Sequence, residues 1–287
     1  MSTTTTAAGR PSSMQSSLTG TLSQFPWWLL IIILTGLFLV YSFYADKTYN
    51  DAFRFIVKGV IVTIRVTLIG YAIAVTIGLL TGLGRVSQNP IIYNILTLYV
   101  QLMRGVPILV TIIYVAFVVA PAAVTGLNTL GAWLANLNLL PAENVLVNLQ
   151  PRDVSLEARA IIALALSYGA FSSEIFRAGI ESIGRGQMEA ARSLGMNYFQ
   201  AMRYIILPQA VRRVLPPLGN DFIAMLKESS LVSALGVQDV TQLARLHAAS
   251  TFRYLETYNV IVFIYLTMTI LLSLGVKALE RKLKVEG

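Results

Sequence analysis

The sequence predicts an all-α polytopic membrane protein, on two observations. Hydrophobic residues make up 55% of the chain and charged residues only 13%, whereas soluble domains carry about a quarter charged residues. Several apolar runs approach or exceed the ~20 residues that a helix needs to cross the hydrocarbon core of a bilayer. Backbone inside a bilayer must satisfy its own hydrogen bonds, and no barrel-like alternation is present, so the spans are expected to be helices.

The charge and the rare residue types exclude several kinds of function. The net charge of +8 would suit nucleic acid, but the basic residues gather at the ends of apolar runs, which favours a membrane and no nucleic-acid partner. The chain has no cysteine, and its single histidine, His247, cannot form a multi-histidine metal site. We therefore expect neither a metal site nor catalytic residues in this chain.

About six transmembrane helices are expected. Residues 1–26 are rich in Ser and Thr with one charge, Arg10, which predicts a disordered tail. An extra N-terminal helix, 27–44, is expected to be retained because no cleavage site follows it. Pro107 predicts a kink within the third span. The remaining spans are expected at about 55–84, 90–119, 158–180, 211–230 and 257–279, with a loop at 121–157 and a basic tail at 281–287.

A polar segment at 184–209 separates the fourth and fifth spans and is typical of two short helices. Gly195 can end the first helix, and Asn197 can cap the second, with Gln200 completing a capping box. Pro208 is expected to end the second helix. Apolar residues at helical spacing predict one stripe along the segment, and this stripe alone would also suit a helix on the membrane surface. Its members are Ala191, Leu194, Tyr198, Met202 and Ile205.

This segment resembles, position for position, the EAA loop of the membrane subunits of ABC importers. The motif reads E-A-A-x3-G-x9-I-x-L-P, where x is any residue. In that family the loop docks on a cytoplasmic ATPase, so the resemblance implies that the matching residues couple this chain to an ATPase. They are Glu189, Ala190, Ala191, Gly195, Ile205, Leu207 and Pro208.

The likeness extends over about residues 54–280, the expected permease core, and is greatest to the polar amino acid branch. Residues 104–107 are similar to that branch's R-G-T-P, with Val106 in place of Thr. Residues 227–231 are similar to K-D-T-S-L, with Glu228 and Ser229 as the departures, which suggest a changed substrate size. The first helix and the 121–157 loop are additional to the five helices that are usual in this family. That loop is expected to be a periplasmic insertion that either touches a substrate-binding protein or is inert.

The resemblance implies the membrane-spanning subunit of an ATP-driven importer for polar amino acids. Its implied partners are a second permease subunit, identical or related, two copies of a cytoplasmic ATP-binding subunit, and a periplasmic substrate-binding protein. No G-x-x-x-x-G-K-[ST] loop occurs in the chain, so no cofactor is expected here and ATP and Mg belong to the ATPase. The expected location is the bacterial inner membrane, with the C-terminus cytoplasmic, as the Lys and Arg at the span ends also indicate.

Two alternatives remain open in transport. The solute could be an opine or a short peptide instead of an amino acid. The chain could also be an ion-driven secondary transporter, which would need its own ion site and no ATPase. Co-purification of an ATPase with this chain would favour the importer over this alternative.

Charged side chains inside predicted spans are candidates for the translocation pathway because they are costly in lipid. Glu174 can meet a substrate ammonium group, or pair only with Arg177 one helical turn away. Arg104 can attract a carboxylate or cap a helix end, and Arg65 is a candidate only because of its depth in a span. Lys227 and Glu228 are adjacent and should point to different sides. The pathway candidates are therefore Arg65, Arg104, Glu174, Lys227 and Glu228.

Overall fold

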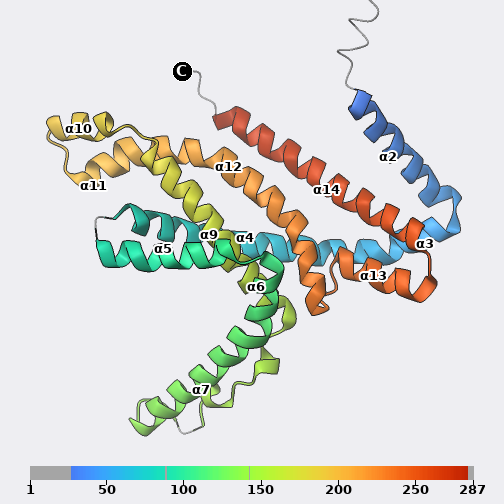
Figure 1. The fold of residues 1–287 in the computed structure, drawn as a ribbon, viewed down its shortest axis with the longest axis horizontal. Coiled ribbons are helices and arrows are strands. Elements are labelled where there is room, and N and C mark those ends of the chain that lie inside the picture. The colour runs from blue at the N-terminus through green and yellow to red at the C-terminus, as the bar shows by residue number, and fades with distance from the viewer. Residues whose placement is uncertain (1–26, 88, 142, 284–287) are drawn as a thin grey trace, which may run out of the picture. The chain divides into compact units, whose positions relative to one another are not determined.

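The computed structural model describes residues 27–87, 89–141 and 143–283, and within these ranges the regular structure is entirely helical (Figure 1). The predicted tail at 1–26 and the last four residues of the predicted basic tail lie outside the described residues. The chain divides into two units, residues 1–50 and 51–287. The predicted all-α fold is confirmed.

The first unit contains α2 (Trp27–Ala45), which is uniformly apolar, and the start of α3 (Lys47–Ile56). The two helices meet at a tight turn. The Asn50 amide donates a 2.8 Å hydrogen bond to the carbonyl of Phe43, and the Phe43 and Tyr49 rings lie 6.2 Å apart. The predicted helix at 27–44 is therefore present.

The second unit is built on two long helices that run in parallel, α4 (Val60–Val86) and α9 (Leu156–Glu181). Small residues let their backbones approach, as is common between helices in membranes. A Cβ at Gly78 would lie 2.6 Å from Cβ of Ser172, and one at Gly82 would lie 2.8 Å from Cβ of Phe176. One turn of 3-10 helix, η1 (Val57–Gly59), joins α3 to α4.

The predicted third span is two helices. After α5 (Pro90–Gly105), Val106 is extended (φ −103°, ψ 135°) and Pro107 caps a new helix, so the expected kink is a complete break. The new helix continues through α6 (Ile108–Tyr114), a π-turn, η2 (Val115–Val119), and α7 (Ala120–Asn136). The predicted loop at 121–157 is therefore wrong in its first part, because Pro121 did not stop the helix.

The π-turn explains how the helix passes Pro121. Within it, the amide of Ala120 bonds to the carbonyl of Val115, five residues back. The next such bond would run from residue 121 to Ala116, but proline has no N–H. The buried Arg159 supplies the missing donor, because its Nη1 lies 2.7 Å from the carbonyl oxygen of Ala116.

Arg159 also secures the segment that leads into α9. Its Nε donates to the carbonyl of Val154 at 3.0 Å, and its Nη2 donates to the carbonyl of Pro151. Pro151 lies in η3 (Pro151–Asp153), which follows the short α8 (Val145–Asn148). One guanidinium thus satisfies three backbone carbonyls from two segments.

Replacing Arg159 with alanine should destabilise the protein by about 3 kcal/mol, since buried carbonyls would lose a charged donor. In a Pro121→Ala background the new N–H can reach Ala116, so the same replacement should cost about 1 kcal/mol less. Thermal unfolding of wild type, Arg159→Ala, Pro121→Ala and the double variant in nanodiscs measures this difference. Equal penalties in both backgrounds would contradict the role assigned to Ala116.

The chain then forms a helical hairpin and two further long helices. Helices α10 (Arg185–Ser193) and α11 (Tyr198–Ala201) make the hairpin, and a second π-turn, η4 (Met202–Ile206), leads into α12 (Leu207–Glu228). Pro208 was predicted to end a helix, and this is wrong, because it lies in the first turn of α12. As at Pro121, a π-turn directly precedes the proline. The chain ends through η5 (Ser229–Leu235), α13 (Val240–Thr251) and α14 (Tyr254–Leu283).

Four segments are long and apolar enough to cross a membrane by length and composition: Lys47–Val86, Ile108–Asn136, Leu156–Glu181 and Tyr254–Arg281. Leu30–Ala45 is a shorter apolar helix. The α12 helix, predicted as the fifth span, is packed between α9 and α14: a Cβ at Gly179 would meet Val214, and one at Gly219 would meet Val276. Of its charged residues, Asp221 and Glu228 are only partly exposed, whereas Arg212, Arg213 and Lys227 are exposed.

Candidate functional site

The α10 helix ends at Gly195 as the sequence predicted. Gly195 has a left-handed φ of +82°. Its amide bonds to the carbonyl of Arg192 at 2.9 Å, and the amide of Met196 bonds to that of Ala191 at 3.1 Å. These two bonds form a Schellman motif, in which glycine is favoured because other residues are strained at this φ.

The α11 helix begins with the predicted capping box. The Asn197 side chain accepts from the amide of Gln200, and the Gln200 side chain accepts from the amide of Asn197, both at 2.9 Å. The chain therefore reverses direction within Leu194–Asn197 through local bonds alone. At its base the hairpin is anchored by a hydrophobic cluster of Ile180, Ile183, Ile206 and Ala210.

The tip of the hairpin presents large apolar side chains on its surface. Leu194 is 83% exposed and Phe199 82%, and Tyr204, further along the chain in η4, is 63% exposed. The predicted single stripe is wrong, because the turn at Gly195 separates its two halves: Ala191 is buried, whereas Leu194 points outward. Of the other residues matched to the motif, Ile205 is half-buried, and Glu189, Ala190, Leu207 and Pro208 are exposed.

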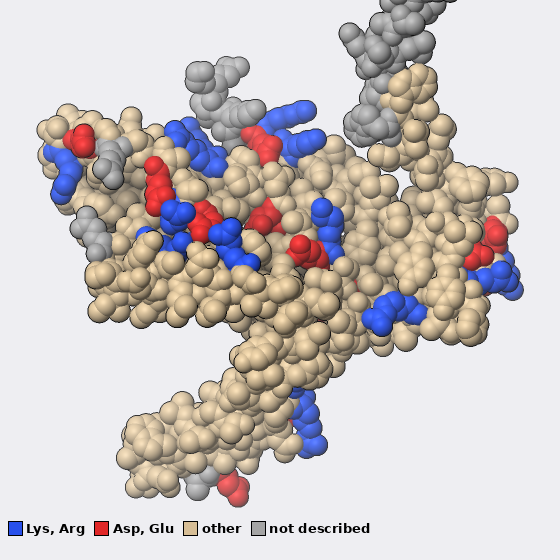
Figure 2. Space-filling model, in the orientation of Figure 1, with Lys and Arg blue, Asp and Glu red and all other residues tan. Residues whose placement is uncertain are grey.

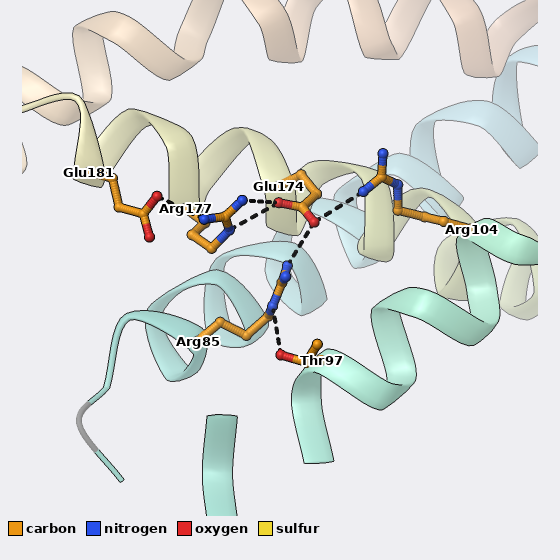
Figure 3. Close-up of polar contacts among 6 residues, drawn as sticks. All are labelled: Arg85, Thr97, Arg104, Glu174, Arg177 and Glu181. Atoms are coloured by element: carbon orange, nitrogen blue, oxygen red, sulfur yellow. Dashed lines mark hydrogen bonds and ion pairs between the residues drawn. The ribbon is translucent and has the colours of Figure 1, made fainter. Parts of the chain in front are cut away.

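A cluster of charges joins three helices near the hairpin (Figure 3). Glu174 on α9 lies at its centre: one carboxylate oxygen is 3.0 Å from Arg104 and 3.1 Å from Arg85, and the other is 2.9 Å from Arg177. Arg177 also pairs with Glu181 at 2.8 Å. The expected pair between Glu174 and Arg177 is present, but it is one part of a larger network.

Sequence analysis did not identify Arg85 as a partner. Its side chain is only 5% exposed and contacts Thr97 of α5 at 3.3 Å through Nε. By its position alone, Arg85 is one of the basic residues at the end of a predicted span. The network connects α4, α5 and α9, so two pathway candidates, Arg104 and Glu174, lie together, which could not be read from residues 70 positions apart.

A second polar cluster lies deeper between α4, α9 and α12, and it is acidic. The Ser172 hydroxyl donates to Asp221 at 3.2 Å, and the Tyr71 hydroxyl donates to the carbonyl of Leu218 at 2.5 Å. Tyr168 lies beside Glu228, whose Oε2 is buried without a hydrogen-bond partner. Among the ion pairs of the described residues, none includes Asp221 or Glu228. Asp221 lies inside the predicted span at 211–230 and meets the same criterion of a charge at membrane depth, but it was not among the predicted candidates.

A cavity of about 370 Å³ that is largely open to the surface adjoins this cluster at the break between α5 and α6. Lys227 and Glu228 both line it, together with Pro107, Ile108, Leu109, Ser230 and Leu231. The two neighbours were predicted to point to different sides, but both line this one cavity; among the described residues no ion pair joins them. The cavity thus offers an ammonium group and a carboxylate at different positions of its wall.

Arg65 lies apart from both clusters. Its Nε and Nη2 donate to the two carboxylate oxygens of Glu157 at 2.7 and 2.6 Å, which ties α4 to the first turn of α9. This bidentate pair accounts for a charge at that position. A contact of Arg65 with the pathway stays a prediction.

The sequence is similar to those of known proteins. Residues 74–285 match the family model described as binding-protein-dependent transport system inner membrane component. The chain is 30% identical over 234 residues to the glutamine transport system permease protein GlnP of Escherichia coli (strain K12), which covers 82% of this chain and 95% of GlnP. It is 32% identical over 231 residues to the probable amino-acid permease protein YxeN of Bacillus subtilis (strain 168), with 80% and 92% covered.

Two solved structures resemble the fold. The crystal structure of an amino acid ABC transporter with histidines aligns with a TM-score of 0.65 and 34% identity, over 84% of this chain and 98% of that one. An inward-facing conformation of the MetNI methionine ABC transporter aligns with a TM-score of 0.59 over 80% and 97%. At 17% identity the second likeness bears on the fold alone.

Proposed function

Because this chain belongs to the family of inner membrane components of binding-protein-dependent transport systems, we propose that it forms part of the membrane pathway of an ATP-driven importer for polar amino acids. The coupling hairpin, residues 184–206, is the observation that carries this proposal. The names of the relatives, which include glutamine and amino-acid permeases and an amino acid ABC transporter, support the class of substrate.

The coupling hairpin is suited to dock on an ATPase. Its reversal is fixed by a Schellman motif and a capping box, so it is preorganised and loses little entropy on binding. Leu194 and Phe199 present an apolar tip, and aromatic and aliphatic anchors of this kind supply most of the energy in protein interfaces. ATP and Mg would be bound by that ATPase, whose side of the membrane would be the cytoplasm.

The partners follow from the class of transporter. A complex of this kind would contain two permease subunits, identical or related, two ATPase subunits, and a periplasmic protein that delivers the solute. The C-terminus, which follows α14, would then lie in the cytoplasm with the coupling hairpin. Transport would need no covalent chemistry from this chain.

The cavity at the α5–α6 break suits a zwitterion. A free amino acid carries an ammonium and a carboxylate group, and the cavity wall carries Glu228 and Lys227. The Tyr168 hydroxyl is hydrogen-bonded to the Glu228 carboxylate, but its Oε2 has no partner, and an incompletely satisfied carboxylate gains from a charged ligand. Asp221 adds negative charge behind it, which favours a cationic group on the substrate.

Replacing Glu228 with glutamine should lower the maximal uptake rate about tenfold, because a charge-assisted hydrogen bond contributes about 1.5 kcal/mol. ATP hydrolysis without substrate should stay unchanged, since Glu228 lies outside the coupling hairpin. Uptake by the reconstituted complex, at saturating binding protein, measures the first quantity. The matched variant Glu181→Gln removes an exposed carboxylate outside this cavity and should leave uptake near that of wild type.

The function itself is tested by co-reconstitution with the candidate ATPase and binding protein across a panel of amino acids, opines and short peptides. Stimulation of ATP hydrolysis by one polar amino acid is the expected result. If an opine or a peptide stimulates instead, the class of substrate is wrong while the importer remains. If no ATPase binds and uptake follows an ion gradient, the chain is a secondary transporter.

A further inference from the structure

One side chain joins the two stems of the coupling hairpin. The chain enters the hairpin from the end of α9, at Ser182, and leaves it through η4 into α12. Arg213, in the second turn of α12, donates from Nη1 to the carbonyl of Ser182 at 2.5 Å and to the Ser182 hydroxyl at 2.9 Å. The whole coupling hairpin lies between these two residues in the sequence, so their contact closes the hairpin at its base.

The end of α9 is arranged to receive this cation. Ser182 is the C-cap residue of α9, and the last carbonyls of a helix have no partner within it. The Ser182 hydroxyl donates to the carbonyl of Gly179 at 2.7 Å, which uses its one hydrogen and leaves its oxygen to accept from Arg213. The helix dipole also favours a positive charge at a C-terminus. The contact therefore depends on both the donor and the charge of Arg213.

Close packing supports the same junction. A Cβ at Gly179 would clash with Cγ1 of Val214, which is buried. Further along the hairpin, a cavity of about 990 Å³ lies between it and the ends of α4 and α9, with Val86, Arg192 and Tyr198 in its wall. Because this space separates the hairpin from the helix ends, the orientation of the hairpin relative to α9 depends on the contacts at its base.

The charge network begins directly beside this junction. Glu181 precedes Ser182 in the chain and pairs with Arg177 at 2.8 Å, and Arg177 pairs with Glu174 at 2.9 Å. Glu174 then holds the arginines of α4 and α5. Figure 2 shows acidic and basic side chains gathered in one band over α9 and α12. A continuous series of contacts therefore leads from the hairpin, through Arg213 and the end of α9, to the helices that meet at Glu174.

The neighbouring arginine lacks this contact. Arg212 is exposed like Arg213, and no hydrogen bond or ion pair among the described residues includes it. Two adjacent residues of the same charge and length thus differ in their contact with Ser182. Arg212 is therefore a matched control for Arg213.

We propose that Arg213 is a positioning residue for coupling, because it clasps the two stems of the hairpin to the end of α9. When an ATPase displaces the hairpin, α9 and its charge network then move with it, and the hairpin does not tilt over the cavity beside it. Packed side chains and hydrogen-bond networks carry coupling of this kind between distant sites. The role in coupling rests on the proposed function, since it requires an ATPase on the hairpin.

The clasp itself can be tested without an ATPase. The chain has no cysteine, so spin labels at Ile162→Cys and Phe199→Cys, both exposed positions, report the distance between α9 and the hairpin tip. Arg213→Met removes the charge and the donors but keeps a long side chain that suits a helix. In the full chain in nanodiscs, this variant should broaden the distance distribution about twofold, since the hairpin becomes free to move on a local scale. Arg212→Met should leave the distribution narrow.

The role in coupling is measured as the ATP hydrolysed per solute molecule transported by the reconstituted complex. Arg213→Met should raise this ratio about fivefold, the effect of losing one exposed hydrogen bond from a charged donor. The affinity for the ATPase should stay unchanged, because the tip of the hairpin is intact. Arg213→Lys keeps a charged donor and should restore most of the coupling, and Arg212→Met should match wild type.

The two measurements fail separately. An unchanged distance distribution in Arg213→Met would overturn the clasp. A broader distribution with an unchanged ratio of ATP to solute would overturn its role in coupling, and so would equal effects of Arg212→Met and Arg213→Met, which would point to surface charge alone. A wild-type chain that recruits no ATPase would refute the proposed function and with it the role in coupling, whereas the spin labels would still decide whether the clasp exists.

Discussion

A valine at position 195 should uncouple ATP hydrolysis from transport. Gly195 has a φ of +82° within the Schellman motif that ends α10, and a residue with Cβ costs about 1–2 kcal/mol there. A β-branched residue is worse than most. We expect substrate-stimulated ATP hydrolysis of the reconstituted complex to fall about tenfold, since 1.4 kcal/mol corresponds to that factor.

The matched control stands at the same position. Asparagine enters the left-handed region far more readily than valine, and a Cβ at Gly195 meets nothing within 4 Å. Gly195→Asn should therefore retain most of the stimulation. If asparagine is as damaging as valine, the cause is a clash with the ATPase surface and not the backbone of the turn.

Replacing Glu174 with glutamine should cause a large loss of stability. Arg85 would remain 5% exposed without a carboxylate partner, and breaking a buried pair in this way costs about 3 kcal/mol. Arg104 and Arg177 would lose the same carboxylate, although both are more exposed. The unfolding temperature of the purified protein in nanodiscs is the measurement.

Two further variants show whether the loss of stability comes from the unpaired buried charge at this position. Glu181→Gln removes a half-exposed carboxylate from the same network and should change stability by about 0.5 kcal/mol or less. Glu174→Leu combined with Arg85→Met removes both charges and should recover a large part of the loss, because apolar replacements of a buried pair are often neutral. A Glu174→Gln protein as stable as Glu181→Gln would show that the network contributes little.

Local chemistry decided which features could be predicted from the sequence. The end of α10 and the start of α11 depend on residues within five positions of one another, namely Gly195, Asn197 and Gln200, and these were predicted correctly. The network around Glu174 depends on Arg85 and Arg104, which come from other helices. Only the Arg177 pair, one turn away, could be expected.

The two wrong helix ends have one physical cause. Pro208 was predicted to end a helix because proline removes a donor and its ring obstructs the preceding turn, and the loop predicted at 121–157 begins at another proline, Pro121. In the structure a π-turn precedes each proline and widens the helix there. At Pro121 a remote residue, Arg159, replaces the lost donor, and a contact across 43 positions leaves no local signal.

The π-turns also set the rotational phase of the helices that follow them. Each holds one residue more than a regular turn, and one residue corresponds to about 100° of rotation around a helix axis. The faces of α7 and α12 are therefore offset from those of α6 and α11 by that angle. If either π-turn, Val115–Val119 or Met202–Ile206, relaxed to regular α-helical bonding with every residue kept, each later side chain of that helix would rotate by about that angle onto a different neighbour. The wide hydrogen bonding of these two turns is thus as constrained as the identities of the residues beyond them.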